Sequence, residues 1–289
     1  MGRHFKKIIL SLVLIGFLVA CATTPITNRK SLILIPFDVE LSLGEKAFRD
    51  ILRKEKLSTE KELKAMIRRV GKRIAAVSDM PDLDWEFKLV DSDSKNAFAL
   101  PGGKVAFYEG ILKVCKNEAG VATVMGHEIA HAIARHGAER ITQQLILTGV
   151  ITAAAIKYED DKNKKYILAG LGVGATVGIT LPFSRRNESE ADHIGLIYMA
   201  RAGYDPKEAV EFWKRFDDEK KKKKGFKMPA FLSTHPSDEK RVAELTALLP
   251  GAMEEYQRAG KKYGKGRVLD LKGLEDEEKD EKKKKKHRH

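Results

Sequence analysis

The pattern H-E-x-x-H at residues 127–131 constrains the fold of this chain more than any other feature of its sequence. It lies in a run whose apolar residues recur at helical spacing, and Asn117 is placed to cap that helix. Residues four apart on a helix share a face, so His127 and His131 can bind one zinc ion. Glu128 lies beside them, where it can take a proton from a water molecule that the metal activates.

The motif alone would also fit a chance match on an amphipathic helix. Glu128 argues against this alternative, because it falls toward the apolar side, where a carboxylate without a function is costly. A third ligand is also available. Glu188 and Asp192 lie four residues apart on an expected helix, so one can bind zinc while the other orients a ligand histidine. Glu190 points elsewhere on that helix. Taken in isolation, these acidic residues would also fit an exposed helix surface that carries several salt bridges.

Length and composition indicate a globular body with charged appendages. The chain has 289 residues, 43% hydrophobic and 33% charged, which is enough for one large domain or two small ones. Its formal net charge is +13, but the basic residues are scattered, and only 7% of the residues are aromatic. No nucleic-acid motif accompanies them, so we expect no nucleic-acid partner. With two cysteines, Cys21 and Cys115, the chain has no disulfide framework.

Residues 1–21 are typical of a targeting segment. A basic start precedes an apolar core that is too short to span a bilayer comfortably. The core ends in Leu-Val-Ala-Cys at residues 18–21, which resembles the bacterial lipobox and implies cleavage before Cys21 and acylation of that cysteine. A simple N-terminal membrane anchor is the alternative. Ala22 follows the cysteine, which by lipoprotein sorting habits suggests a lipid-anchored, periplasm-facing protein of the outer membrane in a bacterial cell envelope.

The remaining chain divides into a tether, one domain and a tail. We expect residues 22–37 to form a tether, flexible at residues 22–25, and residues 38–250 to form the folded domain. Residues 251–289 are polar and highly charged, and we expect the last part of this tail to be disordered.

A hairpin is predicted directly before the zinc helix. Alternating residues predict strands over 96–100 and 104–108, on either side of a Pro-Gly-Gly turn. In zinc peptidases an edge strand beside the metal pairs with the extended substrate, which would be the role of this segment. The residues of this candidate substrate strand are Asn96, Ala97, Phe98 and Ala99. An ordinary hairpin without a function is the alternative.

Two apolar segments rich in glycine and alanine follow the zinc helix, at residues 145–156 and 166–182. The first is too short to span a bilayer and the second is marginal, so we expect a helical hairpin that is buried or faces a membrane, with a transmembrane pair as the alternative. Ser184 is then expected to cap the helix that carries the downstream carboxylates.

Four further short sequence motifs, or extensions of those above, occur in order along the chain. They are N-A-F-A-L-P-G-G at 96–103, G-H-E-I-A-H at 126–131, F-S-R-R-N-E at 183–188 and S-T-H-P at 233–236. H-E-x-x-H followed by E-x-x-x-D is the gluzincin arrangement. Together with the lipobox, these motifs resemble the HtpX and CAAX-protease family of zinc metallopeptidases (peptidase family M48), and within it the BepA/LoiP-like periplasmic lipoprotein branch. The resemblance covers roughly residues 22–250.

This resemblance implies an α+β, mostly α-helical, gluzincin-type metallopeptidase domain with a small β-sheet or hairpin beside the active-site helix. It implies one Zn²⁺ per chain on His127, His131 and Glu188, with Asp192 behind the ligands and Glu128 as the catalytic base. His235 is implied as a fourth zinc ligand that keeps the enzyme latent. An oxyanion donor and a surface histidine are the alternatives for His235.

The expected function is that of a membrane-tethered zinc metalloendopeptidase that hydrolyses misfolded or unassembled envelope proteins. The alternative is a chaperone-like factor for outer-membrane protein assembly with a largely latent protease site, whose partners would include the envelope assembly machinery. Both functions keep the zinc site, so the motif does not separate them. A zinc module without catalysis is disfavoured, because Glu128 would have no task there.

Overall fold

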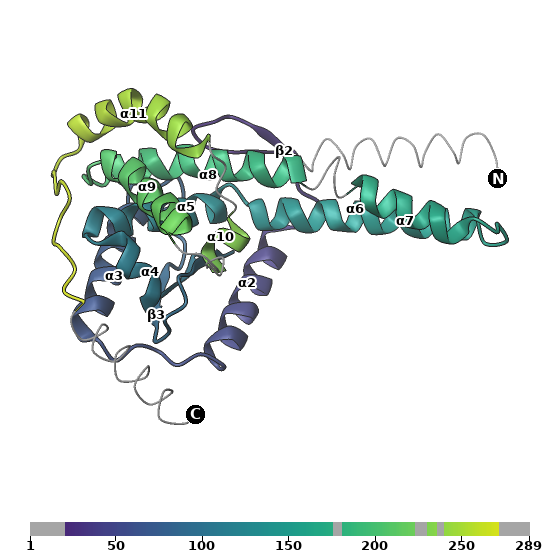
Figure 1. Ribbon diagram of the computed structural model, residues 1–289, viewed down its shortest axis with the longest axis horizontal. Helices are drawn as coiled ribbons and strands as arrows, with labels where there is room; N and C mark the ends of the chain where they lie inside the picture. The colour runs from purple at the N-terminus through teal and green to yellow at the C-terminus, as the bar shows by residue number, and fades with distance from the viewer. Residues whose placement is uncertain (1–20, 176–180, 223–229, 236–239, 272–289) are drawn as a thin grey trace.

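The computed structural model describes residues 21–175, 181–222, 230–235 and 240–271 (Figure 1). The expected signal peptide up to Ala20, the end of the second apolar segment, the residues that follow His235 and the end of the tail lie partly or wholly outside these residues.

Helices make up most of the described chain. They are α2 (Phe37–Leu52), α3 (Lys61–Ala75), α4 (Glu109–Cys115), α5 (Glu118–Ile133), α6 (His136–Lys157), α7 (Lys164–Ala175), α8 (Leu181–Arg201), α9 (Lys207–Lys222), α10 (Ala230–Thr234) and α11 (Arg241–Arg258). The strands are β1 (Cys21–Thr23), β2 (Lys30–Leu32), β3 (Glu86–Val90), β4 (Ala97–Leu100) and β5 (Lys104–Tyr108). This content confirms the expected α+β class with a small sheet.

The predicted hairpin is part of a three-stranded sheet. The strand order is β3-β5-β4, with β5 parallel to β3 and antiparallel to β4. Every residue of β5 is buried, as expected for a central strand. Gly102 and Gly103 form the turn at φ +83° and +79°, a left-handed conformation that glycine adopts without strain. This topology leaves β4 as an edge strand.

Helix α5 carries the zinc motif and is buried along most of its length. Asn117 caps it, because its Oδ1 accepts a hydrogen bond from Gly120 N at 2.9 Å, as predicted. Helix α8 crosses α5 at two glycines. A Cβ on Gly126 would lie 2.6 Å from Gly195 O, and one on Gly195 would lie 2.7 Å from His127 N. The two backbones therefore touch, and this contact brings the carboxylates of α8 onto the zinc motif.

The N-terminal segment differs from the expected flexible tether. Strands β1 and β2 pair in antiparallel fashion, with Cys21 opposite Leu32, and the turn between them contains Ile26 and Asn28 at positive φ. Thr24 is buried and donates a hydrogen bond to Glu190 on α8 at 2.8 Å. Strands of three residues have too short a pattern to be predicted, and the residue on α8 that Thr24 contacts lies 166 positions further along the chain.

Two helix boundaries also differ from the prediction. Helix α8 begins at Leu181, so Ser184 lies inside the helix and not at its cap. Helix α11 runs through Pro250 to Arg258, past the expected domain boundary at residue 250. Leu245 and Ala252, on either side of Pro250, are both buried, so α11 packs against its neighbours α8 and α9 before and after the proline.

Helices α6 and α7 form the expected helical hairpin, which extends away from the body of the molecule (Figure 1). Beyond residue 143, its described apolar side chains are exposed or half-buried, and Leu145, Val150 and Ile156 are 55%, 51% and 69% exposed. Among the described residues, no helix combines the length and the apolar character needed to cross a membrane.

Candidate metal centre

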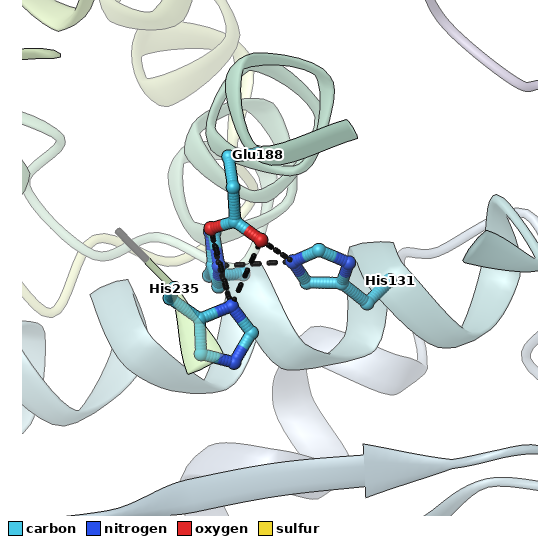
Figure 2. Close-up of side chains that lie close together, drawn as sticks. His131, Glu188 and His235 are labelled. Atoms are coloured by element: carbon cyan, nitrogen blue, oxygen red, sulfur yellow. Dashed lines mark hydrogen bonds and ion pairs between the residues drawn. The ribbon is translucent and has the colours of Figure 1, made fainter. Parts of the chain in front are cut away.

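Four side chains from separate parts of the chain converge on one point. Figure 2 shows Glu188 from α8 opposite His131 from α5 and His235, which directly follows α10. His127 is the fourth member, and its Nε2 lies 3.0 Å from His131 Nε2 and 3.2 Å from His235 Nδ1. The oxygens of Glu188 lie 3.4 Å from His127 Nε2, 3.3 Å from His131 Nε2 and 3.1 Å from His235 Nδ1.

The spacing of these atoms fits zinc. Ligand atoms at about 2.0–2.1 Å from a tetrahedral zinc ion lie roughly 3.3 Å from one another. The separations given above, which involve both oxygens of Glu188, range from 3.0 to 3.4 Å, and the ligand atoms of all four residues lie within 4.8 Å of one another. Three imidazole nitrogens and one carboxylate oxygen are also donors that zinc prefers. The cluster can therefore hold one zinc ion.

Asp192 contacts His127 on the side of the ring that faces away from the cluster. Its Oδ1 lies 2.9 Å from His127 Nδ1, and it accepts a hydrogen bond from Arg241 Nη2 at 2.6 Å. Burial raises the pKa of Asp192, but the charge of Arg241 and the bond to His127 outweigh it and lower that pKa. An ionised Asp192 fixes the orientation of the ring, and so its Nε2 faces the cluster.

The charge of the cluster follows from its contacts. Burial lowers the pKa of His127, but the hydrogen bonds to Asp192 and Glu188 outweigh it and raise that pKa to about 9. Burial raises the pKa of Glu188, but the surrounding imidazoles outweigh it and hold that pKa far below its usual range. Glu188 is therefore an anionic ligand at neutral pH.

Glu128 is only 2% exposed and lies between the cluster and the sheet. Its Oε2 accepts a hydrogen bond from Ala99 N on β4 at 2.9 Å. Its Oε1 accepts no hydrogen bond from the described residues, although His235 Nε2 lies 3.3 Å away. Burial raises the pKa of Glu128, and nearby His235 and His127 oppose that rise. One oxygen of a fixed, buried carboxylate is therefore available for a proton.

A cavity of about 380 Å³ lies beside the cluster. Residues 96–101 form one wall, so the structure places the candidate substrate strand Asn96, Ala97, Phe98 and Ala99 at this cavity. Glu128, His131, Glu188 and His235 also line it. The edge strand, the base and the metal ligands thus face one space.

The sequence of residues 61–249, more than half of the chain, matches the model of peptidase family M48. The chain belongs to peptidase family M48. M48 peptidases are zinc metalloendopeptidases, so the family gives the enzyme class and the cofactor, and the cluster supplies groups able to bind the ion.

Several relatives support this M48 assignment. The mitochondrial metalloendopeptidase OMA1 of Schizosaccharomyces pombe is 38% identical over 79% of this chain and 66% of its own length. OMA1 of Saccharomyces cerevisiae is 34% identical over 81% of this chain and 71% of its own length. The beta-barrel assembly-enhancing protease of Escherichia coli is 28% identical over 71% of this chain and 42% of its own length. The expected family is confirmed, whereas the BepA/LoiP-like branch stays a prediction.

Sequence reasoning missed two buried residues next to the ligands. Arg241, which is 4% exposed, and His136, which is 5% exposed, contact Asp192 and His131 respectively. The signal for His136 was its position five residues after His131, just past the end of α5. Nothing in the local pattern distinguishes Arg241, because an arginine at the start of a helix is ordinarily exposed. Glu190 does point away from the cluster, as predicted, but it is buried and not on the surface.

Proposed function

We propose that this M48 peptidase is a membrane-associated endopeptidase that cleaves misfolded or unassembled proteins of the bacterial cell envelope. The observation that carries the proposal is the free, buried oxygen of Glu128 beside the four-residue cluster and an edge strand. A zinc site with a purely structural role has no use for such a carboxylate.

Glu128 and strand β4 have separate roles in the proposed reaction. His127, His131 and Glu188 would hold the zinc ion, which would supply the Lewis acid for water activation and for polarisation of the scissile carbonyl. Glu128 accepts a proton at Oε1 and returns it to the leaving amine, while the Ala99 N–H holds Oε2 in place. An extended substrate pairs with the open edge of β4, which presents backbone and not a particular side chain. This mode of binding suits unfolded segments of many sequences.

The test is to measure zinc content and cleavage of an unfolded casein-type substrate for wild type and Glu128→Gln. We expect the variant to keep its zinc and to lose about 10²–10⁴-fold in turnover, because general base catalysis is removed. Glu159→Gln, in the exposed loop at the tip of the α6–α7 hairpin, is the matched control and should behave as wild type. Loss of zinc in Glu128→Gln would show that Glu128 has a different role.

The membrane part of the proposal rests on the lipobox-like residues 18–21 and acylation of Cys21. Two or three acyl chains hold a protein firmly at a membrane, whereas one does so only weakly. Cys21→Ser should abolish labelling by a tagged fatty acid and leave the apolar segment uncleaved. If this variant is processed and located as wild type, the lipobox interpretation is wrong.

A specific contact favours a second candidate, an assembly factor with a largely latent protease site. His235 is buried, with Nδ1 in the cluster and Nε2 3.3 Å from Glu128 Oε1. A histidine so placed fills the fourth ligand position and also approaches the base, which favours a latch over an oxyanion donor.

Removing this histidine separates the roles. If His235 is a latch, His235→Ala raises basal proteolysis; if it stabilises the oxyanion, the same change lowers turnover by about 10²–10³-fold. His193→Ala is the matched control, since His193 lies on α8 outside the cluster. Unchanged activity together with unchanged zinc affinity would exclude both roles.

A further inference from the structure

The two histidines of the zinc motif are held by different partners. His127 Nδ1 faces the carboxylate of Asp192 at 2.9 Å, a common arrangement for a zinc ligand. His131 Nδ1 instead lies 2.8 Å from Nδ1 of His136, the first residue of α6. Two ring nitrogens at this distance form a hydrogen bond only if one carries a hydrogen and the other does not.

If Nε2 of His131 is a zinc ligand, as proposed, that role decides which nitrogen of the ring carries the hydrogen. His131 faces the cluster with Nε2, so in a neutral ring the hydrogen is on Nδ1. His136 must then accept at Nδ1 and carry its own hydrogen on Nε2. That nitrogen lies 3.0 Å from Glu190 Oε2, to which it donates. One tautomer of each ring satisfies all of these contacts.

The N-terminal hairpin holds Glu190 in turn. Glu190 accepts hydrogen bonds from Thr24 Oγ1 at 2.8 Å, from Thr27 Oγ1, and from Arg29 Nε at 2.6 Å. The guanidinium of Arg29 also donates to both oxygens of Glu139 on α6, at 2.8 and 3.0 Å. The turn between β1 and β2 therefore fixes α6 and α8 at the place where His136 meets Glu190.

We infer that His136, Glu190 and Arg29 are positioning residues for zinc, and that the N-terminal hairpin is thereby part of the metal centre. The inference rests on the zinc site of the proposed function. His136 and Glu190 do for His131 what Asp192 does for His127: they fix the tautomer and the orientation of the ring.

The test compares two isosteric replacements of His136 in the full-length protein. Asn places an amide oxygen where His136 Nδ1 stands and keeps an acceptor for His131, whereas Gln reaches toward Glu190 and loses that acceptor. Zinc affinity is measured by competition with a chromogenic chelator. We expect His136→Gln to weaken zinc binding by about 10–100-fold and His136→Asn to weaken it less.

The N-terminal part is tested with Arg29→Met against Arg186→Met. Both arginines donate to Glu139, Arg186 at 3.1 Å, but Arg29 also binds Glu190. We expect Arg29→Met to weaken zinc binding and Arg186→Met to leave it within about threefold of wild type, well short of the 10–100-fold loss expected of an orienting residue.

The outcomes separate this inference from the function it rests on. A wild-type chain that binds no zinc overturns the proposed function. Zinc binding by wild type with equal affinity in folded His136→Gln overturns the inference alone. Equal losses in His136→Asn and His136→Gln show that His136 only packs and does not accept from His131, which also overturns it. Circular dichroism of the zinc-free variants confirms folding, and Thr24→Val tests the hairpin by a milder change if Arg29→Met does not fold.

Discussion

The metal centre buries charged side chains, whereas the α6–α7 hairpin exposes apolar ones. At the centre, charged groups such as Glu188, Asp192 and Arg241 are buried and bound to one another. On the hairpin, Leu145 and Val150 are about half exposed. Buried charges are tolerated only with partners, so each removal there has a large effect. Exposed apolar side chains contribute little to the stability of their own chain. They contribute to binding when another surface covers them.

Helix α6 joins the two regions. Its first turns contribute His136, Glu139 and Thr142 to the buried network, and beyond residue 143 most of its side chains are exposed or half-buried. A cavity of about 810 Å³, lined largely by apolar atoms, lies between β2, α6 and α7. It lies apart from the metal ligands, although it includes Glu139 and Arg186 at its edge. Because α6 is continuous from His136 to Lys157, it connects the hairpin directly to the residues around the zinc site.

The largest expected effect is the loss of a buried charge partner. Arg241→Met leaves the carboxylate of Asp192 without its guanidinium, and breaking a buried ion pair costs about 3–5 kcal/mol. Urea unfolding of the zinc-loaded protein measures this loss. Arg258→Met is the matched control, because its pair with Glu254 is 69% exposed on each side and contributes at most about 1 kcal/mol. Equal effects of the two changes would remove the contrast between the regions.

The next expected effect is on zinc affinity, and it comes from removing the group that orients His127. Asp192→Ala should weaken zinc binding by about 10–100-fold, because the ring loses its fixed orientation while the ligand atom remains. Isothermal titration with a competing chelator measures this affinity. Asp161→Ala, at the exposed tip of the hairpin, should leave it unchanged. An unaltered affinity in Asp192→Ala would contradict the assignment of Asp192.

The same contrast explains what the sequence could predict. His127, His131, Glu188 and Asp192 were predicted because each pair has a helical spacing, which is a local property of the chain. Their convergence across two helices has a local signal too, since Gly126 directly precedes His127 and allows α8 to touch α5.

Arg29, His136 and Arg241 were not predicted as parts of the site. The bonds of Arg29 to Glu139 and of Arg241 to Asp192 join residues 110 and 49 positions apart, and no periodicity encodes such pairs. The N-terminal hairpin was missed for the same reason: its strands are too short to show alternation, and its order comes from Glu139 and Glu190 on distant helices.

The smallest expected effect on stability belongs to the hairpin, and a larger effect on membrane binding is expected if the hairpin faces a membrane. Leu145→Gln and Val150→Gln exchange half-exposed side chains, so each should change the free energy of unfolding by no more than about 0.5 kcal/mol. Val124→Gln, at a buried position of α5, is the contrasting control and should destabilise strongly.

The exchanges in the hairpin should affect binding to phospholipid vesicles more than Val124→Gln does. A fully buried aliphatic side chain contributes about 1.5–3 kcal/mol, so the double exchange in the hairpin should weaken vesicle binding of an unlipidated chain of residues 22–289 by at least about tenfold. Co-sedimentation with vesicles measures this loss. If vesicle binding is unchanged and the protein is instead destabilised, these side chains pack within the chain itself. The hairpin would then belong with the buried metal centre, and the contrast between the two regions would be wrong.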